Sequence, residues 1–169
     1  IQLLRPLPNA TLVLSLPALP KSNELQLTWP GSGQASLAAE GYGILALQGK
    51  QEPLATASIA KVITALCVLE KYPLNGDAPG PTLTMSNRDV VFYQEQISQN
   101  GSRLPVELGQ TLTERQALEA IMIPSANNIA DSLVRWAFGG QTTYAAYANE
   151  YLQRKGLVHT RVGTDASGY

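Results

Sequence analysis

The longest hydrophobic pattern in the chain begins at Ser58 and predicts a helix. From Ser58 onward the residues read S-I-A-K-V-I-T-A-L-C-V-L-E-K, in which apolar side chains leave almost no polar face. A helix that is apolar on every side packs in the interior of a protein rather than on its surface. We therefore expect a central, buried helix here, with Ser58 in its first turn.

Further helices are predicted downstream of this segment. Thr113 and Gln116 have the spacing of a capping box, and the helix that they begin carries Leu118, Ile121 and Met122. Pro124 ends that helix. The next helical pattern stops at Gly139-Gly140 and carries Ile129, Leu133 and Trp136. A last helical run has ordinary core spacing and carries Tyr144, Tyr147, Ala148, Tyr151 and Leu152.

The strands are predicted near the beginning of the chain. Residues 35–47 and 52–56 look like a hairpin that turns at Gln48-Gly49-Lys50. Prolines interrupt residues 1–34, which suits an extended arm or linker better than a sheet interior, although residues 12–16 alternate like a strand. We expect an α/β (α+β) fold with helices packed on an antiparallel sheet, in which an arm of residues 1–34 precedes a domain of residues 35–169.

Composition narrows the classes of function. The chain has 169 residues, of which 44% are hydrophobic, and a formal net charge of −1. That is enough to bury a core, and it gives no electrostatic reason to bind nucleic acid or a membrane surface. The single cysteine, Cys67, is expected to be a core residue, and the single histidine, His159, lies in a segment that we expect to be extended. Neither suggests a metal site, and we expect no cofactor.

Ser58 and Lys61 form the first candidate for chemistry. Residues three apart on a helix lie on one face, so the Lys61 ammonium can reach the Ser58 hydroxyl. A serine becomes a good nucleophile when a base takes its proton, and a lysine can be that base if burial lowers its pKa. The apolar neighbours of Lys61 favour such burial.

A second candidate motif, Ser125-Ala126-Asn127, lies 67 positions after Ser58. It falls on the connection between two predicted helices, which can hold a hydroxyl and a carboxamide at fixed positions. Helix capping is the simpler interpretation of both residues. Ser98-Gln99-Asn100 has the same S-x-N spacing, but it leads into Gly101-Ser102 and is typical of a polar turn.

The S-x-x-K and S-x-N motifs together resemble those of penicillin-binding proteins and serine β-lactamases. The chain most resembles the serine-type D-alanyl-D-alanine carboxypeptidases, from about Trp29-Pro30 to its end, and its T-D-A-S-G segment at 164–168 is similar to the D-P-S-G-L of that family. The resemblance implies that Ser58 is the acylated nucleophile, Lys61 its general base and Ser125 a proton relay. It also implies that Asn127 binds the peptide backbone of the substrate.

The resemblance further implies a peptidoglycan stem peptide as substrate, acylation by β-lactams, and a location outside the cytoplasmic membrane. The third motif of the family, K-T-G, does not occur in the chain. In the family, further strands follow D-P-S-G-L, so we expect the C-terminal strands to come from a longer protein or from a second polypeptide. The chain begins at Ile1 without a leader or a membrane-spanning run, which we interpret as a processed or trimmed product.

Other interpretations stay open at this point. A class A β-lactamase shares the first two motifs, but its E-x-x-L-N context does not follow Asn127, so the carboxypeptidase is preferred. A penicillin-binding or sensor module without turnover would keep the same serine. An α/β interaction domain in which both motifs are accidents is the remaining possibility.

Overall fold

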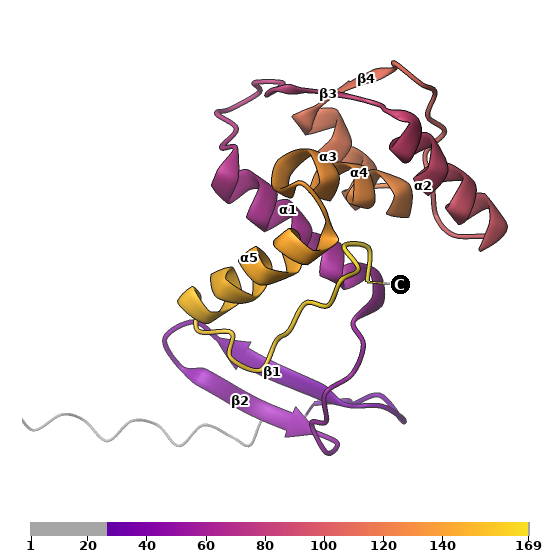
Figure 1. Ribbon diagram of the computed structural model, residues 1–169. Coiled ribbons are helices and arrows are strands. Elements are labelled where there is room, and N and C mark those ends of the chain that lie inside the picture. Colours follow the sequence, from indigo (N-terminus) through magenta and orange to yellow (C-terminus); the bar gives the residue numbers. More distant parts are fainter. Residues whose placement is uncertain (1–26, 169) are drawn as a thin grey trace, which may run out of the picture. The chain divides into compact units, whose positions relative to one another are not determined.

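The computed structural model describes residues 27–168 (Figure 1). The chain divides between Glu52 and Pro53 into two compact units. The alternating residues 12–16 lie outside the described part of the chain. An extended arm that ends at residue 34 therefore stays a prediction. The described elements are helices and antiparallel sheets, which confirms the predicted mixed α/β class.

The described part of the first unit forms a hairpin of β1 (Ala35–Ala39) and β2 (Gly43–Gln48). The two strands are antiparallel, and Ala39 pairs with Gly43 across the turn. Gly41 has a φ of +78°, a left-handed conformation that glycine adopts without steric cost. The chain therefore already reverses at residues 40–42, and our prediction of a turn at 48–50 followed by a strand at 52–56 is wrong.

The second unit is mainly helical, and its first helix is preceded by a 3₁₀ turn. Its helical elements are η2 (Ala57–Ile59), α1 (Ala60–Lys71), α2 (Asn87–Ser98), α3 (Glu114–Met122), α4 (Asn127–Phe138) and α5 (Gln141–Arg154). A short antiparallel sheet that we did not predict pairs β3 (Thr82–Thr84) with β4 (Thr111–Thr113). The Thr113–Gln116 capping box begins α3 as predicted. His159 lies in a turn after α5 and not in the extended segment that we expected.

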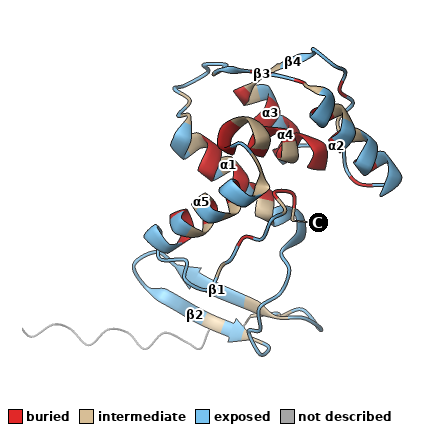
Figure 2. Ribbon diagram, in the orientation of Figure 1, coloured by how far each residue is buried: buried red, intermediate tan, exposed pale blue. Residues whose placement is uncertain are grey.

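The core of this unit lies among α1, α3, α4 and α5, where the buried residues gather in Figure 2. α4 contacts α1, α2, α3 and α5, so most of its residues are buried. Cys67 is a fully buried, free cysteine, as expected. The fully buried apolar side chains include Val68, Ile121, Ile129, Leu133 and Leu152.

The prediction that α1 is buried on every side is wrong. Lys61, Thr64, Cys67 and Val68 face the core, but a row at helical spacing is exposed and consists of Ile59, Val62 and Leu66. α3, α4 and α5 pack against this helix within the unit. These helices contact only the side of α1 opposite the exposed row. The apolar sequence of α1 is therefore not sufficient to bury the helix on every side.

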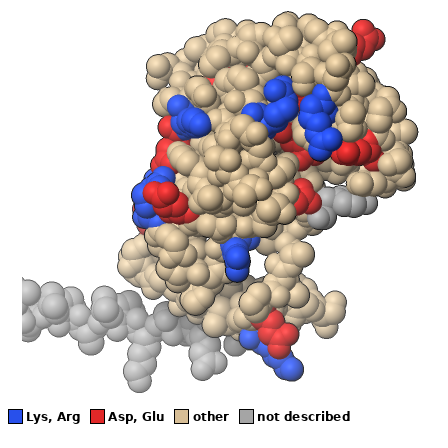
Figure 3. Space-filling view, in the orientation of Figure 1, with Lys and Arg blue, Asp and Glu red and all other residues tan. Residues whose placement is uncertain are grey.

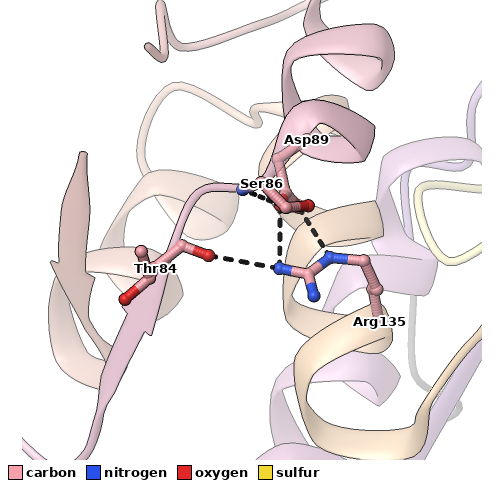
Figure 4. A network of polar contacts seen from close by, with 4 residues as sticks. All are labelled: Thr84, Ser86, Asp89 and Arg135. Atoms are coloured by element: carbon pink, nitrogen blue, oxygen red, sulfur yellow. Dashed lines mark hydrogen bonds and ion pairs between the residues drawn. The ribbon is translucent and has the colours of Figure 1, made fainter. Parts of the chain in front are cut away.

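An ion pair with a buried carboxylate and a partly exposed guanidinium connects α2, α4 and β3 (Figure 4). Arg135 lies 2.8 Å from Asp89 and also donates to the Thr84 carbonyl at 3.4 Å. Asp89 accepts from the backbone and the hydroxyl of Ser86 at 2.7 and 2.6 Å. Burial alone would raise the pKa of Asp89, but the bonds from Arg135 and Ser86 hold it below its usual value. The network holds α2 against α4, and the positive charge of Arg135 compensates the buried negative charge of Asp89.

Charged side chains are mixed in sign on the face of the helical unit drawn in Figure 3. Lys and Arg lie beside Asp and Glu over that face. Within the same unit, Arg154 is paired with Glu70 and Glu150 at 2.7 and 2.9 Å. No large region of one sign is visible on that face.

Candidate active site

Ser58 lies in η2, the 3₁₀ turn that leads into α1, and its side chain is exposed. We expected it in the first turn of the α-helix itself. The residue before it, Ala57, has a φ of +47°, a left-handed conformation that costs free energy for a residue with a Cβ. Such backbone strain is common at functional sites because the surrounding structure maintains it. The turn presents the hydroxyl outward at the start of the helix.

The Lys61 amino group is the centre of the site. Its side chain is only 1% exposed, and Nζ lies 3.0 Å from Ser58 Oγ and 3.2 Å from Ser125 Oγ. Nζ also donates to Asn127 Oδ1 at 2.7 Å and to the Ser167 carbonyl at 3.2 Å. All four residues that the sequence singled out therefore meet around one nitrogen atom.

The connection between α3 and α4 positions Ser125 and Asn127. Ser125 has a φ of +58°, and the amide after it, that of Ala126, donates to the Ala120 carbonyl at 3.0 Å. The backbone amide of Asn127 donates to the Ser102 carbonyl at 2.8 Å. These bonds replace helical partners at the end of α3 and the start of α4. The left-handed turn at Ser125 directs its hydroxyl toward Lys61.

The loop at 164–168 closes the buried side of the site. Asp165 Oδ1 accepts from the amide and the hydroxyl of Ser167 at 2.8 and 2.7 Å, which shapes the loop. Thr64, one turn after Lys61 on α1, donates to the Ala166 carbonyl at 2.8 Å and bonds to the Tyr144 hydroxyl at 2.8 Å. The loop is thereby fixed to α1, and its Ser167 carbonyl is held against the lysine.

The environment of Lys61 shifts its acid–base equilibrium toward the neutral amine. Burial lowers the pKa of Lys61, and the negative charges of Asp165 and then Asp131 oppose part of that shift. Burial also raises the pKa of Asp131 to about 7, helped by the charges of Asp165 and Glu95. An amine with a lowered pKa at 3.0 Å from a hydroxyl can accept its proton.

Sequence reasoning missed three polar residues that support the site: Thr64, Gln96 and Tyr144. Thr64 was the one polar residue between Lys61 and Glu70 in an apolar run, a signal that could have been used. Gln96 is 7% exposed on α2 and accepts from Asn127 Nδ2 at 2.9 Å. Nothing in the local sequence of α2 links Gln96 to a residue 31 positions away.

The rival motif at Ser98 has the local structure that we expected of a polar turn. Ser98 ends α2 and donates to the Glu95 carbonyl at 2.7 Å, and Asn100 turns left-handed with a φ of +53°. Within residues 27–168, no three His, Cys, Asp or Glu side chains form a group that could hold a metal ion.

A cavity of about 360 Å³ lies beside the site. Its lining combines α2, α4, the start of α5 and the loop at 164–168. The residues that the site and this cavity share are Gln96, Asp131, Asp165 and Ser167. A carboxamide, two carboxyl groups and a serine therefore converge next to the lysine.

Solved structures show the same fold. The Streptomyces K15 DD-transpeptidase aligns with a TM-score of 0.67 at 22% identity, over 84% of this chain and 55% of that one. Penicillin binding protein 6B from Escherichia coli aligns with a TM-score of 0.70 at 19% identity, over 86% and 45%. The D-alanyl-D-alanine carboxypeptidase from Mycobacterium tuberculosis aligns with a TM-score of 0.63 at 24% identity, over 79% of this chain and 46% of that one. No curated protein matches the chain.

The fold is thus that of the penicillin-binding peptidases. The family model described as D-alanyl-D-alanine carboxypeptidase matches residues 38–168, and the chain belongs to this family. The resemblance inferred from the sequence motifs is therefore confirmed. The chain spans about half the length of the solved structures to which it is similar.

Proposed function

We propose that the protein is a serine D,D-carboxypeptidase that removes the terminal D-alanine from peptidoglycan stem peptides through an acyl-enzyme on Ser58. The observation that carries this proposal is the position of Lys61 Nζ, within 3.2 Å of both Ser58 Oγ and Ser125 Oγ. One buried amine can therefore exchange protons with two hydroxyls. Membership of the carboxypeptidase family supports the choice of substrate.

In the proposed acylation, Ser58 Oγ attacks the carbonyl carbon of the last peptide bond. Its proton passes to the neutral Lys61 amine as the new C–O bond forms. When the C–N bond breaks, Ser125 donates its proton to the leaving D-alanine amine and recovers one from Lys61. Water then hydrolyses the Ser58 ester. Asn127 would bind the substrate backbone through the second hydrogen of Nδ2, since its oxygen accepts from Lys61 and Nδ2 also donates to Gln96.

Three finer points belong to the same proposal. β-Lactams would acylate Ser58 by the same route, because they present a reactive acyl group to the same nucleophile. A strand carrying K-T-G, contributed from outside these 169 residues, would complete the oxyanion hole and the substrate site. The protein would act outside the cytoplasm, where stem peptides are. Among the described helices, none has the length and apolar character to span a bilayer.

Labelling with a fluorescent penicillin tests the nucleophile. In the full-length protein we expect covalent labelling that maps to Ser58 and is abolished in Ser58→Ala. Ser98→Ala is the matched control, because it removes a serine of the rival motif at the exposed end of α2, and it should label normally. Labelling of Ser58→Ala at another residue would overturn the assignment.

A second measurement separates the enzyme from a penicillin-binding module without turnover. The proposed enzyme releases free D-alanine from a peptide that ends in D-Ala-D-Ala, and Ser58→Ala does not. If the full-length protein is labelled at Ser58 but releases no D-alanine from such peptides, the module without turnover is the correct interpretation.

A further inference from the structure

The side-chain amide of Asn127 is held from both sides. Its oxygen accepts from Lys61 Nζ at 2.7 Å, and its nitrogen donates to Gln96 Oε1 at 2.9 Å. Asn127 is 2% exposed and Gln96 is 7% exposed, so both bonds lie away from solvent. The Lys61 ammonium offers only donors, and Nζ donates to the oxygen of Asn127, so the nitrogen of that amide needs an acceptor on the opposite side.

The Gln96 carboxamide is itself confined by the turn that follows α2. The Gly101 amide donates to the Gln96 backbone carbonyl at 2.9 Å. A Cβ at Gly101 would lie 2.1 Å from Gln96 Oε1 and 3.1 Å from Asn127 Nδ2. Gly101 is buried, and its missing side chain leaves the space that the Gln96 oxygen occupies.

We propose that Gln96 is a positioning residue for the reaction. By accepting from Asn127 Nδ2, it fixes the asparagine with its oxygen toward Lys61, and so holds the lysine amine against the Ser58 hydroxyl. This inference rests on the proposed function, because it takes Lys61 as the base. It adds a residue from α2, an element that contributes none of the four residues Ser58, Lys61, Ser125 and Asn127.

Loss of this acceptor has a definite consequence. Without Gln96 Oε1, the Asn127 nitrogen is a buried donor that has lost its partner, which costs free energy. Rotation of the side-chain amide away from its present orientation lowers that cost. Rotation removes an acceptor from the Lys61 ammonium, so the pKa of Lys61 falls further and the amine loses its fixed position. Small misplacements of a catalytic group cost about tenfold to a hundredfold in rate.

The experiment uses the full-length protein and two substitutions at one position. Gln96→Met keeps the length of the side chain but has no amide acceptor, whereas Gln96→Glu keeps an oxygen acceptor and adds negative charge. Gln94→Met is the control, because Gln94 lies exposed on the same helix and outside the lining of the cavity beside the site. Two quantities are measured: the plateau rate of acylation by penicillin at high pH, and the pKa of Lys61 from carbon-13 NMR of its labelled Cε.

We expect Gln96→Met to lower the plateau rate about tenfold or more and to lower the pKa of Lys61. Gln96→Glu should restore the plateau rate to within about threefold of wild type. The acid limb of its pH–rate profile should move to higher pH, because the added negative charge stabilises the Lys61 ammonium. Gln94→Met should change neither quantity. An unchanged pKa of Lys61 in Gln96→Met overturns the proposal. So does a Glu variant as slow as the Met variant, since a merely structural glutamine predicts that result.

Gly101→Ala provides an independent test if Gln96→Met does not fold. The added Cβ must displace the Gln96 oxygen, so the variant should show the same fall in rate and in the pKa of Lys61. The double variant of Gln96→Met and Gly101→Ala should be no slower than the slower single variant, and additive losses would contradict the proposal. If wild type is not acylated at Ser58, the proposed function fails, and the Lys61 titration alone decides the role of Gln96.

Discussion

The backbone of Gly168 lies directly against the carbonyl of Ala57, the residue before the reactive serine. A Cβ at position 168 would come within 2.1 Å of the Ala57 oxygen and 2.7 Å of the Ala60 Cβ. Gly168 also has a φ of +72°, which disfavours any other residue. The loop at 164–168 can therefore approach the turn at Ser58 this closely only through a glycine. The same loop brings the Ser167 carbonyl to Lys61.

Gly168→Ala should separate these two segments. We expect slower acylation of Ser58 by penicillin and a free energy of unfolding reduced by about 1–3 kcal/mol, because a left-handed alanine and a backbone clash are both unfavourable. Gly163→Ala in the same region is the matched control, since a Cβ there has nothing within 4 Å. Equal acylation rates for the two variants would show that the close contact has no role in the site.

Lys61→Arg tests the general base. A guanidinium keeps its charge at any working pH and cannot accept the Ser58 proton, so acylation should fall about a hundredfold or more at pH 7. Lys71→Arg, at the other end of the same helix, should leave the rate unchanged. The rates are followed from pH 5 to pH 10 by stopped-flow labelling. A Lys61→Arg variant that reacts at nearly the wild-type rate at neutral pH would exclude this lysine as the base.

Thr64→Val tests the buried hydroxyl that fixes the loop. Valine has the same shape but would leave the Tyr144 hydroxyl and the Ala166 carbonyl without this partner, which costs about 1–3 kcal/mol of stability. Thr64→Ser keeps the hydroxyl and loses only a methyl group. The urea midpoints of the two variants should therefore differ, with valine the less stable. The reverse order would mean that packing, and not hydrogen bonding, is the main contribution of Thr64.

Asp131→Asn tests the pH dependence of stability. The pKa of Asp131 is about 7 in the folded protein against 3.8 for an ordinary aspartate, so the folded state binds this proton more tightly. Stability from this group is therefore full below pH 4 and is lost as the pH rises to about 7. The loss is on the order of 4 kcal/mol, since each pKa unit corresponds to about 1.4 kcal/mol. Asparagine has no such proton and keeps an acceptor for Gln141, which donates to Asp131 Oδ1.

We therefore expect Asp131→Asn to be more stable than wild type at pH 8 and similar to it at pH 4. The free energies of unfolding are measured in urea at both values. Asp77→Asn, at an exposed position, is the control and should show no such difference. A constant difference between Asp131→Asn and wild type at all pH values would mean that the carboxyl does not titrate in this range.

Local features of the sequence determined much of the site. The capping box at Thr113, the proline at 124 and the glycines at 139–140 set the helix ends, because these signals act through hydrogen bonds and backbone angles of neighbouring residues. The spacing of Ser58 and Lys61 brought their side chains together for the same reason. In the first unit, Gly41 and Gly43 allowed an earlier turn than the one at Gly49, and the local signals did not distinguish the two.

Tertiary structure alone decided which supporting groups hold the residues around Lys61 in place. Gln96, Tyr144 and the Ser167 carbonyl come from separate elements, and their contacts depend on how α2, α5 and the final loop pack against α1 and α4. The exposed row of Ile59, Val62 and Leu66 has the same cause, because burial is set by neighbouring elements and not by the polarity of the helix itself. The sequence determined which groups could react, and packing over long separations determined which polar partners hold them in place.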